Sequence, residues 1–438
     1  LNLKSIDANN LAISFSGNEI PKNTETYAFA YAGHQFGHFT ILGDGRAILL
    51  GEHINKNKRY DIQFKGSGKT EYSRNGDGKA ALGPMLREYI ISEAMYSLNI
   101  PTTRSLAVVK TGEKIIRETE LNGAILTRVA SSHIRVGTFQ FFTYKKDKKN
   151  LEMLVDYTIK RHFPEIKIDE NKYINLIDRL MNKQINLVVD WMRVGFIHGV
   201  MNTDNMSLSG ETIDYGPCAF MDTYDPKTVF SSIDHLGRYA YYNQPTITKW
   251  NLARFAECLI PFLSKDKNEA IEIATSKINE FDKIYEGKWL NMMRGKLGIL
   301  DEDKQDEVLI FDLLQWMHLN KADYTNTFCN LIDENIIPDP VFKRKDFVDW
   351  KDRLKQRLLR FKNKFRDVNL IMKTSNPLII PRNQKVEEAL EAAENNDLSK
   401  VKRLLEILSK PYDNQDNVKE FQKPFNGSKI EYKTYCGT

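Results

Sequence analysis

The sequence contains little cysteine and no long apolar run. Its 438 residues include four cysteines, and no two of them show the C-x-x-C spacing of common metal and redox sites. This low density excludes a disulfide-stapled secreted scaffold and makes a reducing cytoplasm the default expectation. No window approaches the roughly 18 apolar residues of a membrane span, and no secretory signal pattern is visible, so we expect no membrane partner.

Neither sign of charge dominates the composition. The chain has 63 Lys and Arg residues against 58 Asp and Glu, a net charge of +5, and this mild excess does not by itself indicate a nucleic-acid partner. Hydrophobic residues make up 41% and charged residues 28%, which is typical of a soluble globular protein. A chain of this length exceeds one ordinary core, so we expect two or three domains or lobes.

The first 130 residues differ in pattern from the rest. Glycine-rich turns separate short β-forming runs, and one helical pattern follows Pro84 and stops at Asn99-Ile100-Pro101. Later apolar residues recur mainly at helical spacing. The expected strands are 47–50, 60–64, 105–109, 114–117 and 124–129, and the main expected helices are 151–163, 173–194, 250–263, 268–286, 303–319, 346–365 and 386–405.

This order of elements predicts an α+β fold. Residues 1–130 would form a β-rich N-lobe, and residues 131–438 a larger helical C-lobe with functional loops and a C-terminal tail. The natural ligand site is the cleft between the two lobes.

The densest chemical signal is the stretch from His198 to Pro217. Within it, Asn202, Asp204, Asn205 and Asp214 place four oxygen-bearing side chains within thirteen positions. Mg²⁺ prefers such oxygen ligands and usually takes one or two carboxylates together with phosphate and water. Asp214 begins an Asp-Tyr-Gly triplet that is similar to the Asp-Phe-Gly element of protein kinases. Asn and Asp also crowd ordinary loops, which is the competing interpretation for each residue alone.

Lys65 follows a predicted strand and precedes Gly66-Ser67-Gly68-Lys69-Thr70. A P-loop would need a glycine at position 63, where the sequence has Gln63 inside the strand, so this motif fails. In the alternative interpretation Lys65 faces the cleft and pairs with a carboxylate of the next helix, as in kinases. Glu88 and Glu93 are the candidates, and Glu88 has the better reach; a surface lysine and a surface glutamate remain the simpler possibility.

Three weaker signals also point to phosphate or nucleotide. Paired glycines in Gly43-Asp44-Gly45-Arg46 let backbone approach a phosphate, although Gly-Asp-Gly is also an ordinary hairpin turn. Asp77 and Gly78 lie in a strong turn signal that needs no ligand to explain it. Arg128 and Arg135, seven residues apart near a strand end, would suit a phosphate clamp or simple surface exposure.

Together these motifs identify a family. The chain resembles the selenoprotein O family of kinase-like protein adenylyltransferases, in particular its bacterial-type members, and the likeness implies a protein-kinase-like two-lobed fold. The matching stretches are 31–37, 42–46, 64–68, 100–104, 198–206, 213–217, 237–240, 243–245, 376–382 and 435–438.

The resemblance implies a role for each matching position. Asp204 would be the catalytic base, and Asn205 and Asp214 would hold Mg²⁺, with Mn²⁺ as the alternative metal. The residues implied to contact ATP are Gly43, Gly45, Arg46, Lys65, Glu88, Asp77, Gly78, Arg128, Arg135 and Asp214.

The resemblance also implies the reaction. ATP would be flipped relative to kinases, AMP would pass to Ser, Thr or Tyr hydroxyls of proteins, and pyrophosphate would leave. In kinases the asparagine lies five residues after the catalytic aspartate, whereas Asn205 follows Asp204 directly. Two alternatives stay open: a protein kinase that uses the γ-phosphate, and a non-catalytic ATP-binding scaffold.

Two further expectations follow from the likeness. Many animal members carry selenocysteine near the C-terminus, where this chain has Cys436, and a Cys218–Cys436 disulfide would tie the tail to the active-site edge. Two free thiols are the alternative. We expect a cytoplasmic location for a bacterial protein and a mitochondrial one for a eukaryotic protein.

Overall fold

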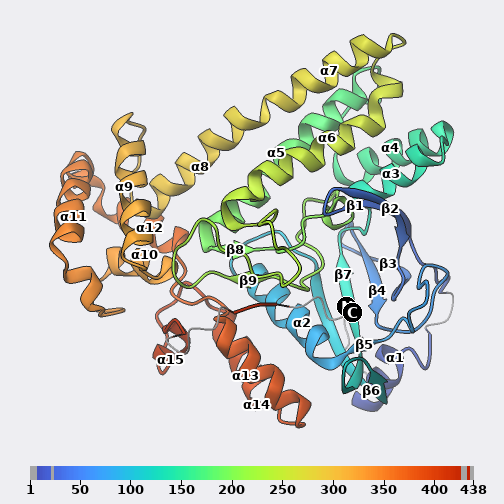
Figure 1. Cartoon of the computed structure of the whole chain (residues 1–438), viewed down its shortest axis with the longest axis horizontal. Helices are drawn as coiled ribbons and strands as arrows, with labels where there is room; N and C mark the ends of the chain where they lie inside the picture. The colour runs from blue at the N-terminus through green and yellow to red at the C-terminus, as the bar shows by residue number, and fades with distance from the viewer. Residues whose placement is uncertain (1–6, 21–23, 426–431, 435–438) are drawn as a thin grey trace.

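The computed structural model describes residues 7–20, 24–425 and 432–434. The fold is α+β, with a β-rich N-terminal region followed by a helical C-terminal part, as expected of a kinase-like protein (Figure 1). No helix within the described ranges is both long and apolar enough to cross a bilayer.

An antiparallel sheet forms the centre of the N-terminal region. Its strands are β3 (Ala47–Asn55), β4 (Lys58–Lys65), β5 (Ala80–Ala81), β6 (Arg104–Ile116) and β7 (Glu120–Ala130), and β7 pairs with β4, β5 and β6. In the β4–β7 register Gln63 lies opposite Arg128, and Lys65 is two residues further along the same face. The sheet therefore presents Gln63, Lys65 and Arg128 side by side.

Two differences from the expected strands have local causes. The runs predicted at 105–109 and 114–117 belong to the single strand β6, whose pairing with β7 is irregular between Lys110 and Lys114. A separate hairpin, β1 (Ala30–Gln35) and β2 (His38–Gly43), precedes the sheet, and Gly37 at φ +89° suits its tight turn. The short helix α1 (Ala8–Phe15) lies before this hairpin.

Helix α2 (Leu82–Ser97) packs against the sheet. Pro84 lies in its first turn, and Asn99 follows its end with φ +60°. The helix start and the helix end that the sequence predicts are therefore confirmed. Met85, Ile90 and Ala94 are buried in one cluster with Ala124 and Leu126 of β7 and further apolar side chains. Because that face is apolar, Glu88 is carried into the interior with it and is only 2% exposed.

The rest of the chain is mainly helical. The amphipathic helix α5 ends at Gly195, whose left-handed φ of +72° turns the chain directly into the two-residue strand β8. The bounds are α3 (Val136–Tyr144), α4 (Lys148–His162), α5 (Lys172–Val194), β8 (Phe196–Ile197), β9 (Ala219–Phe220), α6 (Gln244–Leu263), α7 (Lys267–Asn279), α8 (Phe281–Leu297), α9 (Gln305–Leu319), α10 (Tyr324–Ile332), α11 (Lys345–Leu358), α12 (Phe365–Ser375), α13 (Asn383–Glu394), α14 (Ser399–Leu408) and α15 (Lys419–Gln422).

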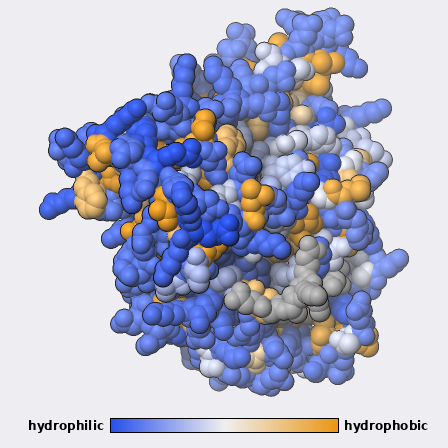
Figure 2. All heavy atoms as spheres, turned by 60° about the vertical axis from the view of Figure 1, so that its left-hand side comes forward, coloured by the Kyte–Doolittle hydropathy of each residue, from blue (hydrophilic) through white to orange (hydrophobic). Residues whose placement is uncertain are grey.

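Three expected long helices are interrupted. The run 268–286 divides into α7 and α8 at Glu280, and the run 386–405 divides into α13 and α14 around Asn396, which has φ +65°. The run 346–365 is interrupted by a 3₁₀ segment at Leu359–Lys364. Phe347, Trp350, Leu354 and Phe361 of the predicted stripe are buried and Leu358 is partly buried, but Phe365 is 68% exposed. The outer surface over α9 to α12 is mainly hydrophilic, as expected for helices that turn apolar faces inward (Figure 2).

The C-terminal helices return to the N-terminal region. Helices α13 and α14 pack on α2, so Val386, Leu390 and Leu404 share a core cluster with Leu86 and Ile90 (Figure 1). Helix α2 is therefore enclosed by the sheet on one side and by α13 and α14 on the other. The position of Glu88 consequently depends on segments separated by some 300 residues.

Arg382 anchors the chain just before α13. Its side chain is 2% exposed, and Nη1 donates to Asp222 Oδ1 at 2.5 Å and to Asp323 Oδ2 at 2.7 Å. Nη2 donates to Asp323 Oδ1 at 3.0 Å and to the Gln422 carbonyl at 2.9 Å. One buried cation thus joins α10, α13, α15 and the chain that follows β9.

We expect Arg382→Leu to lower the free energy of unfolding by about 3–5 kcal/mol, because it leaves Asp323 buried without its cation. Adding Asp323→Asn should recover part of that loss, as measured by urea denaturation. The control is Arg403→Leu, which breaks an exposed pair with Glu406 and should change stability by less than about 1 kcal/mol. Equal losses from Arg382→Leu and Arg403→Leu would contradict this role.

Candidate active site

The stretch from His198 to Pro217 is held between two short strands. β8 and β9 pair Phe196 with Phe220, so the two ends of the stretch lie next to each other. His198 Nε2 lies 2.9 Å from the Ile213 carbonyl and links the two arms of the loop. Residues Thr203–Asn205 form a single 3₁₀ turn on one arm. The fold thereby brings Asp204 and Asn205 close to Asp214.

A cavity of about 410 Å³ opens beside this loop. It is lined from the N-terminal region by the glycine-rich turn and the sheet, and from the C-terminal part by the loop. Predicted site residues that line it are Gly45, Arg46, Lys65, Arg128, Arg135, Asp204, Asn205 and Asp214, and the other lining residues are Tyr31, Gln35, Phe36, Asp44, Ala47, Val200, Asn202, Gly216, Pro217 and Ile233.

Lys65 and Arg128 are joined by two carboxylates. Lys65 Nζ lies 2.7 Å from Glu88 Oε2 and 2.7 Å from Asp214 Oδ1. Arg128 Nε donates to Glu88 Oε1 at 2.8 Å, and Arg128 Nη2 reaches Asp214 Oδ1 at 2.7 Å. Burial alone would raise the pKa of Glu88, but Arg128 and Lys65 hold it below the ordinary value. Of the two glutamates considered from the sequence, Glu88 is the one that pairs with Lys65, whereas Glu93 binds Arg104.

Asp214 is held as a carboxylate. Its backbone has φ +64°, a left-handed conformation that is uncommon for a residue with a Cβ. Arg135 adds a third cation, with Nη1 3.6 Å from Asp214 Oδ2. Burial would raise the pKa of Asp214, yet Lys65, Arg128 and Arg135 together hold it well below the ordinary value. The group is therefore ionised over the whole physiological pH range.

Asp204 has the opposite environment. Its Oδ1 is buried and has no hydrogen-bond partner among the described residues, although Arg135 donates to its backbone carbonyl at 3.1 Å. Burial raises the pKa of Asp204 to about 6, and the nearby charge of Arg135 only partly opposes this rise. A side-chain hydrogen bond with Gln35 also opposes the rise. A buried carboxyl group that titrates near neutral pH is suited to accept a proton.

Gly33 permits this placement of Asp204. A Cβ built on Gly33 would lie 2.2 Å from Asp204 Oδ1, closer than any real contact. Gly33 lies in the matching stretch 31–37, but no role could be assigned to it from the sequence. Its only signal was a glycine within a β-forming run, which indicates close approach of another group.

Asn205 and Asp214 are the donors that suit a divalent metal. Asn205 lines the cavity, and its Nδ2 donates to the Val200 carbonyl at 2.8 Å, which leaves the amide oxygen as its remaining polar atom. In the described ranges no three His, Cys, Asp or Glu side chains gather closely enough to hold a metal by themselves. One carboxylate with one amide oxygen fits Mg²⁺, because that ion takes its other ligands from phosphate and water.

Four predicted site residues do not line the cavity. Glu88 lies behind Lys65, and Gly43 packs under Tyr72, whose ring would lie 2.2 Å from a Cβ at that position. Asp77 receives both Nη atoms of Arg117 at 2.9 Å, which lowers its pKa to about 2. Gly78 has φ +69° and accepts from Gly68 N at 3.1 Å. Nucleotide contacts by Asp77 and Gly78 stay predictions.

Three polar residues of the cavity region, Asp44, Gln63 and Tyr31, had no role predicted from the sequence. Asp44 is buried, accepts from Gln63 Nε2 at 2.9 Å, and has its pKa raised by burial. Gln63 Oε1 in turn accepts from Arg128 Nη1 at 3.3 Å, and the Arg135 guanidinium lies 4.5 Å from the centre of the Tyr31 ring. Alternation along β4 was an available signal, since Gln63 and Lys65 are two residues apart and share a face.

The cysteines leave the disulfide expectation open. Cys218 is buried, and Cys218, Cys258 and Cys329 form no disulfide with one another. Cys436 lies outside the described residues, so the structure gives no support for a Cys218–Cys436 bond, which stays a prediction.

The fold and the cavity define the class of protein. A strand lysine paired with a helix glutamate, facing an aspartate of an Asp-Tyr-Gly triplet across a cleft, is the arrangement of kinase-like phosphate-transfer enzymes. A family model described as protein adenylyltransferase SelO matches residues 1–409. The chain belongs to this family and is therefore an enzyme of the nucleotidyltransferase class.

Full-length relatives agree with this assignment. The chain is 58% identical over its whole length to a protein nucleotidyltransferase YdiU of Pelagibacter ubique, covering 91% of that protein. It is 55% identical over its whole length to the YdiU protein of Nitrosococcus oceani, covering 89%. It is also 57% identical, over 98% of its length, to that of Halalkalibacterium halodurans, covering 88%.

We expect Asp204→Asn to stabilise the protein at pH 8 but not at pH 4. The native carboxyl has a pKa of about 6, above the ordinary 3.8, so stability decreases as pH rises through this interval and the buried charge forms. The neutral amide avoids that charge and should add about 2 kcal/mol at pH 8 in urea denaturation. The exposed Asp416→Asn is the control, and an Asp204→Asn gain that is equal at both pH values would rule out this environment.

Proposed function

We propose that this enzyme transfers AMP from ATP to Ser, Thr or Tyr hydroxyls of proteins, with Mg²⁺ held by Asn205 and Asp214. The observation that carries the proposal is the separation of two carboxylates across one cavity. Asp214 stays ionised among three cations. Asp204 is buried, its Oδ1 has no hydrogen-bond partner among the described residues, and burial raises its pKa to about 6. Two acids with such different environments suit different tasks, one for metal and one for proton transfer.

Asp204 is the group that we assign to the acceptor. At neutral pH a carboxyl with a pKa of about 6 is mostly ionised, and it can accept the proton of a hydroxyl bound within hydrogen-bond reach. Asp204 lines the cavity, so its carboxyl group borders the space that a bound hydroxyl would occupy. Gly33 lets Oδ1 pack against the backbone of β1, where a side chain would collide with it.

Lys65, Arg128 and Arg135 are the groups that we assign to the phosphates. Their positive charges are already fixed in place inside the cavity, so they stabilise charge that develops on phosphate oxygens without reorganising. Mg²⁺, when bound, supplies further neutralisation of the triphosphate. Glu88 and Gln63 orient Lys65 and Arg128 and do not need to touch the nucleotide.

The positions of the arginines support a flipped ATP. Arg128 and Arg135 are 2% and 3% exposed, so the strongest positive charge lies deep in the cavity. A triphosphate that enters with its γ-phosphate inward is neutralised there, and its α-phosphate then faces the acceptor side. The direct succession of Asp204 and Asn205 agrees with this, because it differs from the spacing that positions metal for γ-phosphate transfer in kinases.

Two wider expectations also stand as proposals. We divide the chain functionally at residue 130, where β7 ends, into a nucleotide-binding lobe and a catalytic lobe, although α13 and α14 return to α2. The bacterial cytoplasm is the location that we propose, and the relatives named above are bacterial proteins.

We expect the protein to retain label from α-³²P-ATP and not from γ-³²P-ATP, since adenylyl transfer keeps only the α-phosphate. Asp214→Asn should reduce this labelling at least about 100-fold, because it removes a charge on which both metal and cations depend. Asp416→Asn, an exposed change of the same kind, should label like the wild type.

Each alternative has its own result in this assay. Retention of the γ label would show a kinase instead. ATP-dependent thermal stabilisation without any covalent label would show a non-catalytic scaffold. Full labelling by Asp214→Asn would overturn the metal assignment while leaving the reaction in place.

A further inference from the structure

A second large pocket lies on the other side of the residues that follow β7. Its volume is about 790 Å³, and it shares no lining residue with the active-site cavity. The turn between β3 and β4, helix α4, one residue of α5 and two serines enclose it. Its cationic lining residues are Lys58, Arg59, Lys160, Arg161 and Lys183, and none of the described residues that line it is a carboxylate.

The two arginines of this pocket form ion pairs with carboxylates that do not line it. Arg59 Nη2 lies 2.6 Å from Glu52 Oε2, and Arg161 also pairs with Glu52. Arg161 Nη2 lies 2.6 Å from Asp61 Oδ1 and 2.6 Å from the Ser131 carbonyl. These contacts fix the Arg161 guanidinium, which is only 6% exposed, in one orientation in the pocket wall.

The three lysines have no such compensation. Lys183 Nζ donates to the carbonyls of His162 and Ser209, at 3.3 and 3.4 Å, and lies 4.4 Å from the centre of the Phe163 ring. Burial lowers the pKa of Lys183, and the more distant Glu165 and Glu211 only partly offset this. None of Lys58, Lys160 and Lys183 forms an ion pair with a carboxylate in the part of the chain that the structure describes.

We propose that this pocket is a second anion site, separate from catalysis, that binds inorganic pyrophosphate. Three uncompensated ammonium groups and a fixed guanidinium around one hollow match a compact anion with several oxygens. Tyr157, Ser131 and Ser209 add hydroxyl groups to the same lining. The choice of pyrophosphate rests on the proposed function, which releases it, whereas the existence of an anion site rests on the pocket alone.

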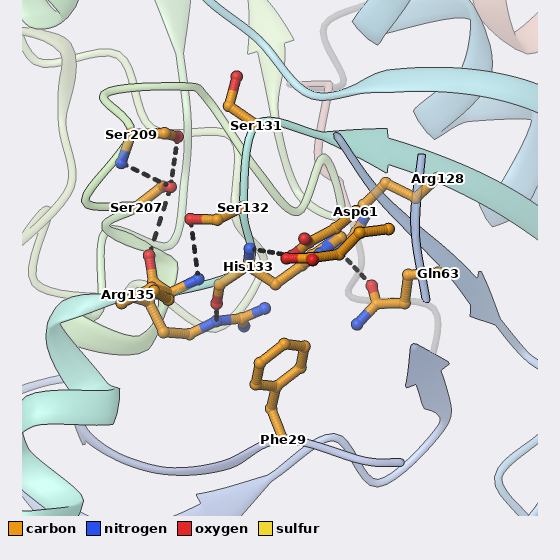
Figure 3. A network of polar contacts seen from close by, with 12 residues as sticks. Phe29, Asp61, Gln63, Arg128, Ser131, Ser132, His133, Arg135, Ser207 and Ser209 are labelled. Carbon is orange, nitrogen blue, oxygen red and sulfur yellow. Dashed lines mark hydrogen bonds and ion pairs between the residues drawn. The ribbon is translucent and has the colours of Figure 1, made fainter. Parts of the chain in front are cut away.

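One short segment separates the two sites. Ser131 lines the pocket and binds Glu211 through both its backbone N–H and its hydroxyl, at 3.0 and 2.7 Å. Four residues later Arg135 lines the active-site cavity, and between them His133 is bonded to Asp61 at 2.9 and 3.1 Å (Figure 3). An anion in the pocket therefore lies directly behind the chain that positions Arg135.

Calorimetric titration of pyrophosphate into the full chain tests this site. A non-hydrolysable ATP analogue at saturating concentration, with Mg²⁺ in excess, blocks the active-site cavity. We expect one further pyrophosphate to bind per chain under these conditions. Lys160→Gln with Lys183→Gln should weaken this binding at least about tenfold, and Lys160→Arg with Lys183→Arg should retain it within about threefold.

The matched control is Lys362→Gln with Lys364→Gln, which removes the same charge from an exposed turn between α11 and α12. The proposal is overturned if this pair weakens binding as much as the pocket pair, or if the blocked wild type binds no pyrophosphate. Should the pocket double variant unfold, the exposed Lys160→Gln alone should still weaken binding at least about threefold, and no change in that variant also overturns the site. Label transfer by the pocket variants should equal the wild type, so failure of this site and failure of the proposed reaction give different results.

Discussion

The buried group of Lys65, Arg128, Glu88 and Asp214 is the interaction on which the rest of the structure depends. Buried charges are tolerated only when they are paired and hydrogen-bonded, and these four satisfy one another through contacts of 2.7–2.8 Å. They come from β4, β7, α2 and the loop before β9, so the group can form only when all four segments are in place. Arg135 adds a third cation beside Asp214, and it also lies 3.9 Å from the buried carboxylate of Asp44.

Helix α2 transmits that constraint to distant parts of the chain. Its inner face places Glu88 between Lys65 and Arg128, and its outer face is covered by α13 and α14. Arg382 holds the start of α13 against α10 through Asp323. The charge arrangement in the cavity therefore depends on the packing of the C-terminal helices against α2.

The sequence predicted the parts of this system that depend on local pattern. The strand before Lys65, the helix after Pro84 and the oxygen-rich loop from His198 to Pro217 each have a local signal, and the structure contains all three. Glu88 was preferred over Glu93 on helical reach, and the structure confirms that pairing.

The rest depended on contacts between segments distant in the sequence. Nothing local shows that Asp77 is bound by Arg117, forty residues away, or that Gly33 adjoins Asp204. The division of the expected helix 386–405 at Asn396 did have a local signal, Asn395-Asn396-Asp397, but the apolar spacing that continues across the break favoured one helix. The family resemblance implied the roles of Asp204 as base and of Asn205 and Asp214 as metal ligands. The structure adds that all three residues line one cavity, which their spacing in the sequence does not show.

The cover over α2 has a consequence for the synthesis of the protein. A ribosome makes α2 early and makes α13 and α14 only near the end of the chain, so the apolar outer face of α2 has no partner during most of translation. Exposed apolar surface of this kind attracts chaperones and promotes aggregation in incomplete chains. A product cut off before α13 would keep every residue of the active-site cavity, yet it would lack the layer that fixes Glu88. The packing around the helix that carries Glu88 is therefore complete only when the C-terminal helices have been made.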